Sequence, residues 1–325
     1  MSITKIKTAS REEWLAERKK SLGGSDMGSV LGMNEYSSPY TVWAEKTGKL
    51  PPKEETEYMK LGHDLEDYVA KRFTEKSGLK VAKDTATWRN SKYPHLHANI
   101  DRKIVKQRAG LECKITSSFS EKNYRDGKFP DRFYAQCVEY LCVTELDRWY
   151  LAVLVYGKGI FIYQLTRIPN DTIPEWCESS VYVDDAEIES LAKFGNDFWV
   201  NYVEKGTPPA VDGSDSTTKT ISTIFPNSNT ESVNLFAYED ALKQYIALGK
   251  QIKELEKLQQ EMANKVKSFM NEAGKGESDG FKVSWLTTDR ATFDNKRFAE
   301  EHPDVDLTDY YKVSSYRTFR VTERK

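Results

Sequence analysis

Apolar residues recur at helical spacing through the first part of the chain. The clearest stripe lies in residues 57–78, where Leu65, Val69 and Phe73 share one face and Gly78 ends the pattern. Residues 38–48 begin with Ser-Pro and end with Gly, which is typical of a short helix. The pattern predicts further helices over 11–22, 27–33 and 133–145.

Runs of strand-forming residues lie between and after these helices. Three runs follow one another closely and predict a three-stranded meander. They span 80–90, 96–105 and 110–116. Residues 148–159 and 160–168 meet at Gly-Lys-Gly and predict a hairpin. Helices, meander, helix and hairpin in this order predict one α/β domain over residues 1–205.

The pattern changes after this domain. Residues 206–232 are rich in Pro, Gly, Ser, Thr and Asp, so we expect a linker or surface excursion there. Residues 233–325 are predicted to form a C-terminal extension. It should hold a long amphipathic helix and then two strands, at 276–294 and 310–324, on either side of a short helix at 295–302.

The long helix is predicted from Tyr238 to Asn271 and carries roughly three heptads. Gln259 is its one polar seam position. The apolar seam positions are Tyr245, Leu248, Ile252, Leu255, Met262, Val266 and Phe269. A seam of this kind packs on its own domain, on a sister subunit or on another protein.

The composition indicates a folded protein outside the membrane. A mean hydropathy of −0.67 with 30% charged residues leaves no apolar run long enough to cross a bilayer. The first 14 residues lack the apolar stretch of a signal peptide, so we expect a cytoplasmic protein. Four cysteines without CxxC pairing argue against a disulfide framework or a zinc site. A net charge of −2 gives no overall attraction to nucleic acid but leaves room for a local basic groove.

Three charged residues on neighbouring strand runs form the main candidate site. Glu112 and Lys114 are two residues apart, so both side chains point to one face of their strand. If the run ending at Asp101 is the adjacent strand, Asp101 lies beside Glu112. Carboxylates and the backbone carbonyl of Cys113 are hard ligands for Mg²⁺, and a lysine nearby favours hydroxide. The pattern fits a metal-dependent nuclease, and it also fits a charge pair on a solvated hairpin.

Helical residues extend this candidate. Glu66 precedes the strands on a helix and supplies a third carboxylate if that helix crosses the sheet; a solvated position is the alternative. Gln136 follows the Lys114 strand, where it either orients water or a phosphate oxygen or makes a structural hydrogen bond. Arg18 and Ser25 flank Lys-Lys-Ser-Leu-Gly-Gly and predict an anion pocket, with a simple helix cap as the alternative.

Five motifs together resemble the YqaJ-type phage recombinases, relatives of lambda exonuclease within the PD-(D/E)xK nuclease superfamily. The resemblance covers about residues 10–165, and the set of motifs is more specific than any one of them. The motifs lie at 14–49, 61–73, 95–104, 110–116 and 133–154. The extra region after Gly206 sets the chain apart from lambda exonuclease itself.

The resemblance implies a mixed sheet flanked by helices and a homotrimeric ring around DNA. It implies digestion of duplex DNA from 5′ ends with Mg²⁺, for which Mn²⁺ substitutes, giving 3′ overhangs for recombination by single-strand annealing. A phage or prophage origin follows, with a single-strand annealing protein as a possible partner of the long helix.

The resemblance also implies a role for each candidate residue. Asp101, Glu112 and the carbonyl of Cys113 become metal ligands, and Lys114 activates or positions water. Glu66 and Gln136 complete the catalytic group. Arg18 and Ser25 match the pair that holds the 5′-terminal phosphate.

Other functions remain open at this stage. The same core is found in endonucleases, and a scaffold that binds DNA ends and recruits an annealing protein is the non-enzymatic alternative. An iron-sulfur nuclease is disfavoured because no cysteine precedes Cys113 and only Cys177 follows Cys142. Aromatic and basic residues interleave after Trp285, which fits either single-strand binding or a core with a solvated face.

Overall fold

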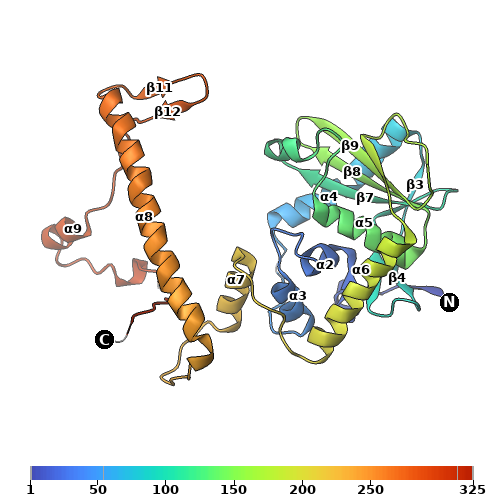
Figure 1. Ribbon diagram of the computed structural model, residues 1–325, viewed down its shortest axis with the longest axis horizontal. Helices are drawn as coiled ribbons and strands as arrows, with labels where there is room; N and C mark the ends of the chain where they lie inside the picture. Colours follow the sequence, from blue (N-terminus) through green and yellow to red (C-terminus); the bar gives the residue numbers. More distant parts are fainter. Residues whose placement is uncertain (1, 54, 313, 324–325) are drawn as a thin grey trace. The chain divides into compact units, whose positions relative to one another are not determined.

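The computed structural model describes residues 2–53, 55–312 and 314–323. The chain divides into two compact units, Met1–Phe225 and Pro226–Lys325, and each is described by itself. Figure 1 shows mixed sheets and helices in the first unit and a long helix, α8, in the second. Among the described residues, no helix is long and apolar enough to cross a membrane.

The larger sheet of the first unit is mixed and has six strands within the described residues. Its order is β10 (Ser179–Tyr182), β9 (Gly159–Thr166), β8 (Arg148–Val155), β7 (Ala109–Thr116), β6 (Arg102–Ile104) and β3 (Val81–Lys83). β7 and β8 pair in parallel along their whole length, and the predicted hairpin is β8 and β9. This mixed sheet with helices confirms the predicted α/β fold class.

A smaller sheet collects strands that are far apart in the sequence. Its order is β1 (Ile3–Ile6), β4 (Thr87–Asn90), β5 (Leu96–Asn99) and β2 (Leu22–Gly23). The predicted three-stranded meander is therefore wrong, because its first two runs each divide between the two sheets. One division is at Asp84, whose carboxylate accepts a hydrogen bond from the Ala86 amide at 3.1 Å and turns the chain.

Helices cover both faces of the larger sheet. α4 (Glu57–Ser77) packs on one face, where Val69 and Phe73 join a buried cluster with Leu111. α5 (Asp131–Thr144) packs on the other, where Cys137 and Leu141 lie in the main core. The remaining α-helices of this unit are α1 (Arg11–Arg18), α2 (Gly24–Val30), α3 (Pro39–Lys46), α6 (Asp185–Phe198) and α7 (Asp215–Ile224).

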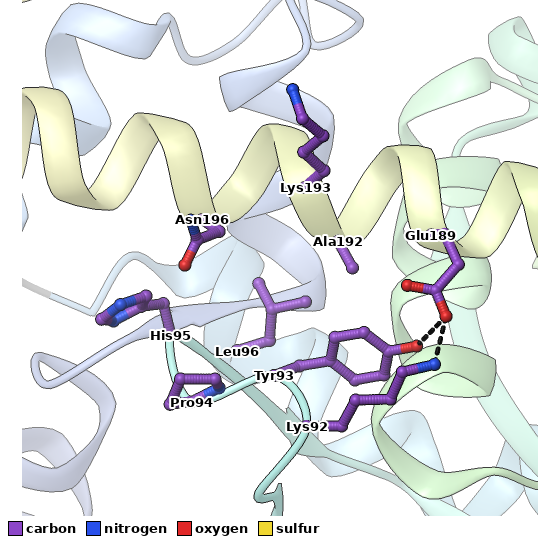
Figure 2. Close-up of a pocket in the computed structure, with 9 residues that line it drawn as sticks. All are labelled: Lys92, Tyr93, Pro94, His95, Leu96, Glu189, Ala192, Lys193 and Asn196. Atoms are coloured by element: carbon purple, nitrogen blue, oxygen red, sulfur yellow. Dashed lines mark hydrogen bonds and ion pairs between the residues drawn. The ribbon is translucent and has the colours of Figure 1, made fainter.

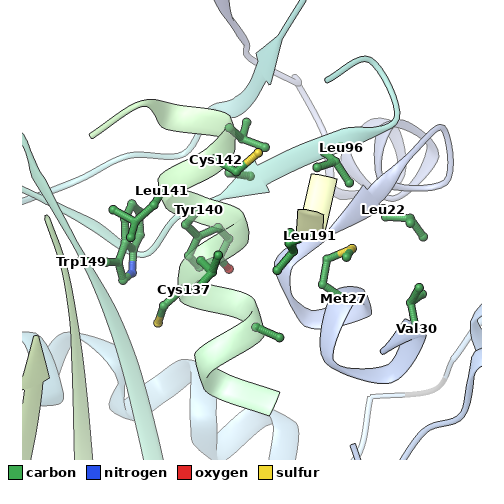
Figure 3. Packing of buried hydrophobic residues seen from close by; sticks show 14 of the residues in the cluster. Leu22, Met27, Val30, Leu96, Cys137, Tyr140, Leu141, Cys142, Trp149 and Leu191 are labelled. Carbon is green, nitrogen blue, oxygen red and sulfur yellow. The ribbon is translucent and has the colours of Figure 1, made fainter. Parts of the chain in front are cut away.

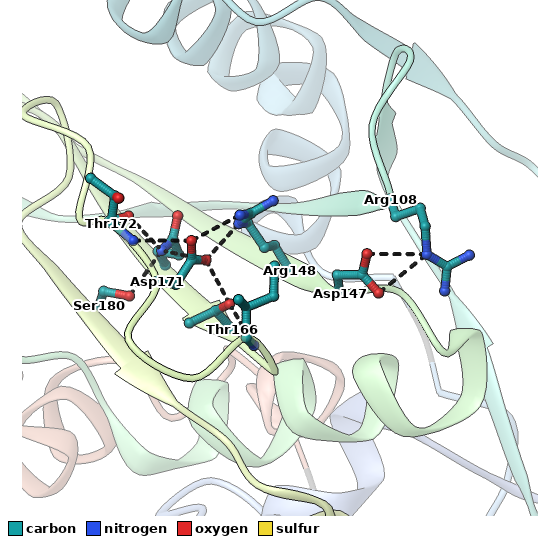
Figure 4. A network of polar contacts seen from close by, with 9 residues as sticks. Arg108, Asp147, Arg148, Thr166, Asp171, Thr172 and Ser180 are labelled. Carbon is teal, nitrogen blue, oxygen red and sulfur yellow. Dashed lines mark hydrogen bonds and ion pairs between the residues drawn. The ribbon is translucent and has the colours of Figure 1, made fainter.

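The main core surrounds α5. Figure 3 shows its side chains between Trp149 of β8 on one side and Met27 of α2 on the other. α1 ends at Arg18, earlier than predicted, because Leu22 already pairs with Leu96 in the smaller sheet. A polar network ties the end of β9 to β8, since Asp171 accepts hydrogen bonds from Arg148 at 2.6 and 2.8 Å (Figure 4).

The segment expected as a linker, 206–232, contains α7. This helix packs on α3, where the Thr41 hydroxyl lies 2.8 Å from those of Ser216 and Thr220. Thr217 and Thr220 are buried by the contact. The first compact unit therefore includes α7 and ends at Phe225.

The second unit is built on α8 (Glu239–Met270), preceded by a 3-10 turn at Phe236–Tyr238. Residues predicted as one strand at 276–294 instead contribute to a hairpin of β11 (Lys275–Glu277) and β12 (Lys282–Ser284). α9 (Asn295–Glu301) matches the predicted short helix. The strand predicted at 310–324 is wrong for the described residues, since 311–312 and 314–323 pair with no sheet.

Candidate active site

Glu112 and Lys114 lie together on β7, as strand alternation predicts. Lys114 Nζ is 2.5 Å from Glu112 Oε1 and 5.3 Å from the centre of the Phe133 ring on α5. The Glu112 side chain is only 3% exposed, whereas that of Lys114 is 27% exposed. Leu111 and Cys113 point to the opposite face and pack in the cluster beneath α4. The strand therefore presents a buried acid and a partly exposed lysine side chain on the face toward α5.

Asp101 is fixed against the same strand. It precedes β6, whose Arg102 pairs with Leu111, so Asp101 comes level with Glu112. Its Oδ2 accepts a hydrogen bond from the backbone amide of Cys113 at 2.8 Å. Asp101, in the bend before β6, and Glu112, on β7, are therefore brought together.

Gln136 of α5 connects this site to the main core. Its Nε2 donates to Glu112 Oε1 at 2.7 Å and to the Tyr140 hydroxyl at 2.8 Å. All three side chains are buried. Tyr140 was not predicted from the sequence, and its signal is the four-residue spacing from Gln136, which places both on one face of the helix.

The electrostatics of the cluster are unbalanced. Burial and then the negative charges of Glu112 and Glu66 raise the pKa of Asp101 well above its usual range. Burial alone would lower the pKa of Lys114, but the carboxylates of Glu112 and Asp101 outweigh it, and the pKa rises. Glu112 Oε2 is buried and has no hydrogen-bond partner. One lysine therefore faces an excess of acidic groups.

Glu66 lies near this cluster but is held by a different cation. Arg102, which is only 3% exposed, forms ion pairs with Glu66 and with Asp67 of α4. The guanidinium also donates to the Asp101 carbonyl at 2.6 Å. Arg102 was missed from the sequence, although its place next to Asp101 was a signal. Arg102 therefore fastens α4 to β6, the strand that Asp101 precedes.

The donor set fits a hard divalent cation such as Mg²⁺. A dication beside Asp101 and Glu112 would balance their charges and give the orphaned Glu112 Oε2 a partner. Over residues 2–53, 55–312 and 314–323, no group of three or more His, Cys, Asp or Glu side chains is arranged to hold a metal ion. Asp101 and Glu112 are the two side-chain candidates because their charges interact, and Glu66 lies near enough to act on Asp101 as well.

Arg18 and Ser25 come together as the sequence suggested. Arg18 Nη2 donates to Ser25 Oγ at 3.3 Å, and the guanidinium stacks 4.7 Å from the Trp14 ring. Ser25 is exposed and Arg18 is half-buried. The pair thus offers a cation and a hydroxyl at the surface, which suits a phosphate group.

A buried ion pair connects the segments that carry Arg18 and Ser25. Lys46 Nζ lies 2.6 Å from Asp26 Oδ2 and donates to the Arg18 carbonyl at 2.9 Å. Asp26 Oδ2 also accepts from the Gly23 amide at 2.9 Å, which begins α2. Burial raises the pKa of Asp26, but the charges of Lys46 and Arg18 outweigh it and lower that pKa overall. Lys46 was not predicted, because a lysine ending a helix is ordinary.

A close approach of α2 to α5 joins the pocket to the acidic cluster. A Cβ on Gly24 would lie 2.9 Å from Gln136 Cγ and 2.8 Å from Tyr140 Cε1, so only glycine fits there. Gly24 therefore lets Ser25 follow directly after the segment that touches Gln136. The two groups of predicted residues belong to one continuous region.

A pocket with a volume of about 210 Å³ is lined by other residues. Lys92 and Tyr93 face Glu189 across it, and His95 and Asn196 lie at its other end (Figure 2). Tyr93 donates to Glu189 Oε1 at 3.0 Å. This pocket includes none of the residues predicted from the sequence. The ion pair of Lys92 with Glu189 connects α6 to the turn between β4 and β5.

The fold and this cluster fit a recombination nuclease, and the chain belongs to the YqaJ-like viral recombinase family. The model of the YqaJ-like viral recombinase domain matches residues 13–147, which include all eight predicted site residues. The chain is 32% identical to YqaJ of Bacillus subtilis (strain 168) over 323 aligned residues. The alignment covers 98% of this chain and 95% of YqaJ. The resemblance drawn from the motifs is confirmed.

Solved structures of two exonucleases are also similar. An alkaline exonuclease (LHK-Exo) from Laribacter hongkongensis matches 60% of this chain and 94% of its own, with 16% identity and a TM-score of 0.47. A phage-related exonuclease from Haemophilus somnus 129PT matches 57% of this chain and 96% of its own, with 10% identity and a TM-score of 0.41.

Proposed function

We propose that this protein is a Mg²⁺-dependent exonuclease that degrades duplex DNA from its 5′ ends. The products would be 3′ single-stranded overhangs, the substrates of recombination by single-strand annealing. The observation that carries the proposal is the buried pairing of Lys114 with Glu112, on the strand whose Cys113 amide binds Asp101.

Asp101, Glu112 and the carbonyl of Cys113 are the proposed ligands of Mg²⁺. When bound, the metal would lower the pKa of a coordinated water and offset charge on the scissile phosphate. Lys114 would stabilise negative charge on the attacking oxygen, because its ammonium group lies beside Glu112 and its side chain is partly exposed. Gln136 would fix the Glu112 carboxylate by its hydrogen bond at 2.7 Å. Glu66 would add negative charge from α4.

The proposed polarity rests on Arg18 and Ser25. A terminal 5′ phosphate carries more negative charge than an internal phosphodiester, so a guanidinium beside a hydroxyl favours it. The contact of α2 with α5 makes this pocket continuous with the acidic cluster. Holding a 5′ end there would present a nearby phosphodiester to Lys114.

The test is digestion of linear duplexes that carry a label at the 5′ or the 3′ end, with Mg²⁺ or with EDTA. The expected result is Mg²⁺-dependent release of nucleotides from the 5′ end. Lys114→Met and Glu112→Gln should each lower the rate by about 10²-fold or more. Lys158→Met is the matched control, because this lysine is exposed in the β8–β9 turn and pairs with Glu121 at 3.4 Å.

Each other outcome identifies an alternative. Internal cuts in circular DNA would make the protein an endonuclease. Tight binding of DNA ends without cleavage would support a scaffold that recruits an annealing protein. Wild-type rates in both site variants would remove the assignment of this cluster. Light scattering with and without DNA would test the trimeric ring.

A further inference from the structure

The long helix α8 carries an apolar seam that its own unit leaves uncovered. The seven apolar seam residues are between 45% and 92% exposed, and no α8 residue is buried. Phe319 touches Tyr245 at one end of the seam, with ring centres 5.4 Å apart. Ile252 and Leu255 in the middle remain 55% and 65% exposed.

The size of this seam is that of an interface. Together these side chains expose on the order of 800 Å², about the area that each partner contributes to a standard stable complex. Contiguous apolar patches on soluble monomers are usually smaller than roughly 600 Å². Most other exposed positions of α8 are polar or charged, with Lys265 paired to Glu261 at 2.8 Å, and Leu258 beside the seam is a further apolar residue with 55% exposure. The seam is therefore a surface that α8 presents to something outside its own unit.

The heptad pattern makes the seam complementary to itself. Residues spaced alternately by three and four along 245–269 fill the a and d positions of a coiled coil, in which each helix supplies the knobs and the holes. Gln259 occupies an a position, so it would face its own copy in a parallel, in-register pair and exchange a hydrogen bond. An antiparallel pair would place it against Leu255 and leave its amide unsatisfied.

The flanking positions also permit this pairing. In a parallel coiled coil each g residue faces the next e residue of the partner. The facing pairs would be Gln244 with Gly249, Gln251 with Glu256, Leu258 with Ala263 and Lys265 with Met270. These pairs set no two like charges against each other, so nothing in the flanks repels a second copy.

We propose that α8 pairs in parallel and in register with α8 of a second copy of this chain, through the seam from Tyr245 to Phe269. The proposal is independent of the nuclease assignment, because it uses no residue of the first unit. It gives the C-terminal extension a structural purpose, which is to hold copies of the enzyme together.

Disulfide trapping in the full chain tests the pairing. Leu248→Cys and Gln259→Cys should each form a covalent dimer on a non-reducing denaturing gel under mild oxidation. The matched controls are Lys250→Cys and Lys257→Cys, which lie on the outer face and should link at least tenfold more slowly. An antiparallel pair would separate the two Leu248 positions by roughly 27 Å along the helix, so linkage there also reports direction.

A second variant separates this pairing from other association. Ile252→Lys/Leu255→Lys should abolish linkage of Gln259→Cys without loss of folding, because the second unit leaves both side chains exposed. Circular dichroism checks the fold. Equal linkage at seam and outer positions, linkage that survives the double lysine, or no linkage until another protein is added would overturn the proposal.

Discussion

The Lys46 ammonium lies 2.6 Å from the Asp26 carboxylate, and only 6% of the lysine side chain is exposed. The same ammonium binds the Arg18 carbonyl, so one buried cation ties the end of α3 to the two segments that carry Arg18 and Ser25. The relative position of Arg18 and Ser25, the proposed phosphate-binding pair, thus depends on the ion pair of Lys46 with Asp26.

Breaking this pair should destabilise the protein, because it leaves the remaining partner buried and uncompensated. Lys46→Met and Asp26→Asn should each cost about 3 kcal/mol of unfolding free energy, and the double variant clearly less than the sum. Urea unfolding of the four proteins at pH 7 measures this coupling. Costs that add to within about 0.5 kcal/mol would show that the two side chains act independently.

Arg18→Gln should reduce the preference for phosphorylated 5′ ends. Losing one charge-assisted hydrogen bond to the phosphate should weaken its binding by about 10- to 100-fold. The ratio of the initial rates on 5′-phosphate and 5′-hydroxyl duplexes should fall by about the same factor. The rate on 5′-hydroxyl duplex should stay within about threefold. Arg11→Gln serves as control, because this exposed residue of the same helix pairs with Glu55. An unchanged ratio would assign end recognition elsewhere.

Tyr140→Phe should weaken the support of Glu112. The variant removes the hydroxyl that holds Gln136 at 2.8 Å but keeps the ring, so unfolding free energy should fall by about 1 kcal/mol. The cleavage rate should fall about threefold to tenfold, with a rise in the Mg²⁺ concentration needed for half the maximal rate. Tyr134 lies on the same helix as Tyr140, and Tyr134→Phe removes a hydrogen bond to Glu187 of α6. This control variant should change neither the cleavage rate nor the Mg²⁺ requirement.

Gly110 should not tolerate a side chain. A Cβ there would lie 2.4 Å from the Trp149 ring, so Gly110→Ala should cost about 1–3 kcal/mol. Gly62→Ala, on α4 with no atom within 4 Å of the added carbon, should stabilise the protein by about 0.5–1 kcal/mol. Thermal unfolding of both variants provides the comparison. Equal shifts of the unfolding temperature in the two variants would mean that β7 relaxes away from Trp149.

His97 should make the protein less stable in mild acid. Burial lowers the pKa of His97 to about 3. Below pH 6.5 this histidine is therefore protonated in the unfolded chain but stays neutral in the folded protein, which favours unfolding. Between pH 7 and 5 the wild type should lose about 2 kcal/mol more than His97→Asn. Denaturant midpoints at both pH values measure the difference, and parallel pH profiles would contradict it.

The local part of the site was predictable from sequence because strand alternation is strict. Glu112 and Lys114 had to share a face, and Asp101 came beside them through the short turn between β6 and β7. Gln136 and Arg18 were found through their motifs. The contacts between them were not predictable, since the Lys46–Asp26 pair and the Gly24–Gln136 approach join segments that are distant in sequence.

The division of the strands into two sheets was also not predictable, because the strands that pair are distant in sequence. β4 and β5 pair with β1 and β2, which lie more than 70 residues earlier. Alternation of polar and apolar residues shows that a run is extended, but it does not identify its neighbour. The predicted C-terminal strand failed differently: its aromatic and β-branched residues favour extension, but no strand pairs with the described part of it.

Asp101 stands where the chain leaves one sheet for the other, between β5 and β6. The position of Asp101 relative to Glu112 therefore depends on the strands of both sheets. β7, which carries Glu112, pairs along its whole length with β8, and β8 ends at Val155. On the proposed function, a chain that ends before Val155 would lack part of the strand that pairs with β7 and should not cut DNA.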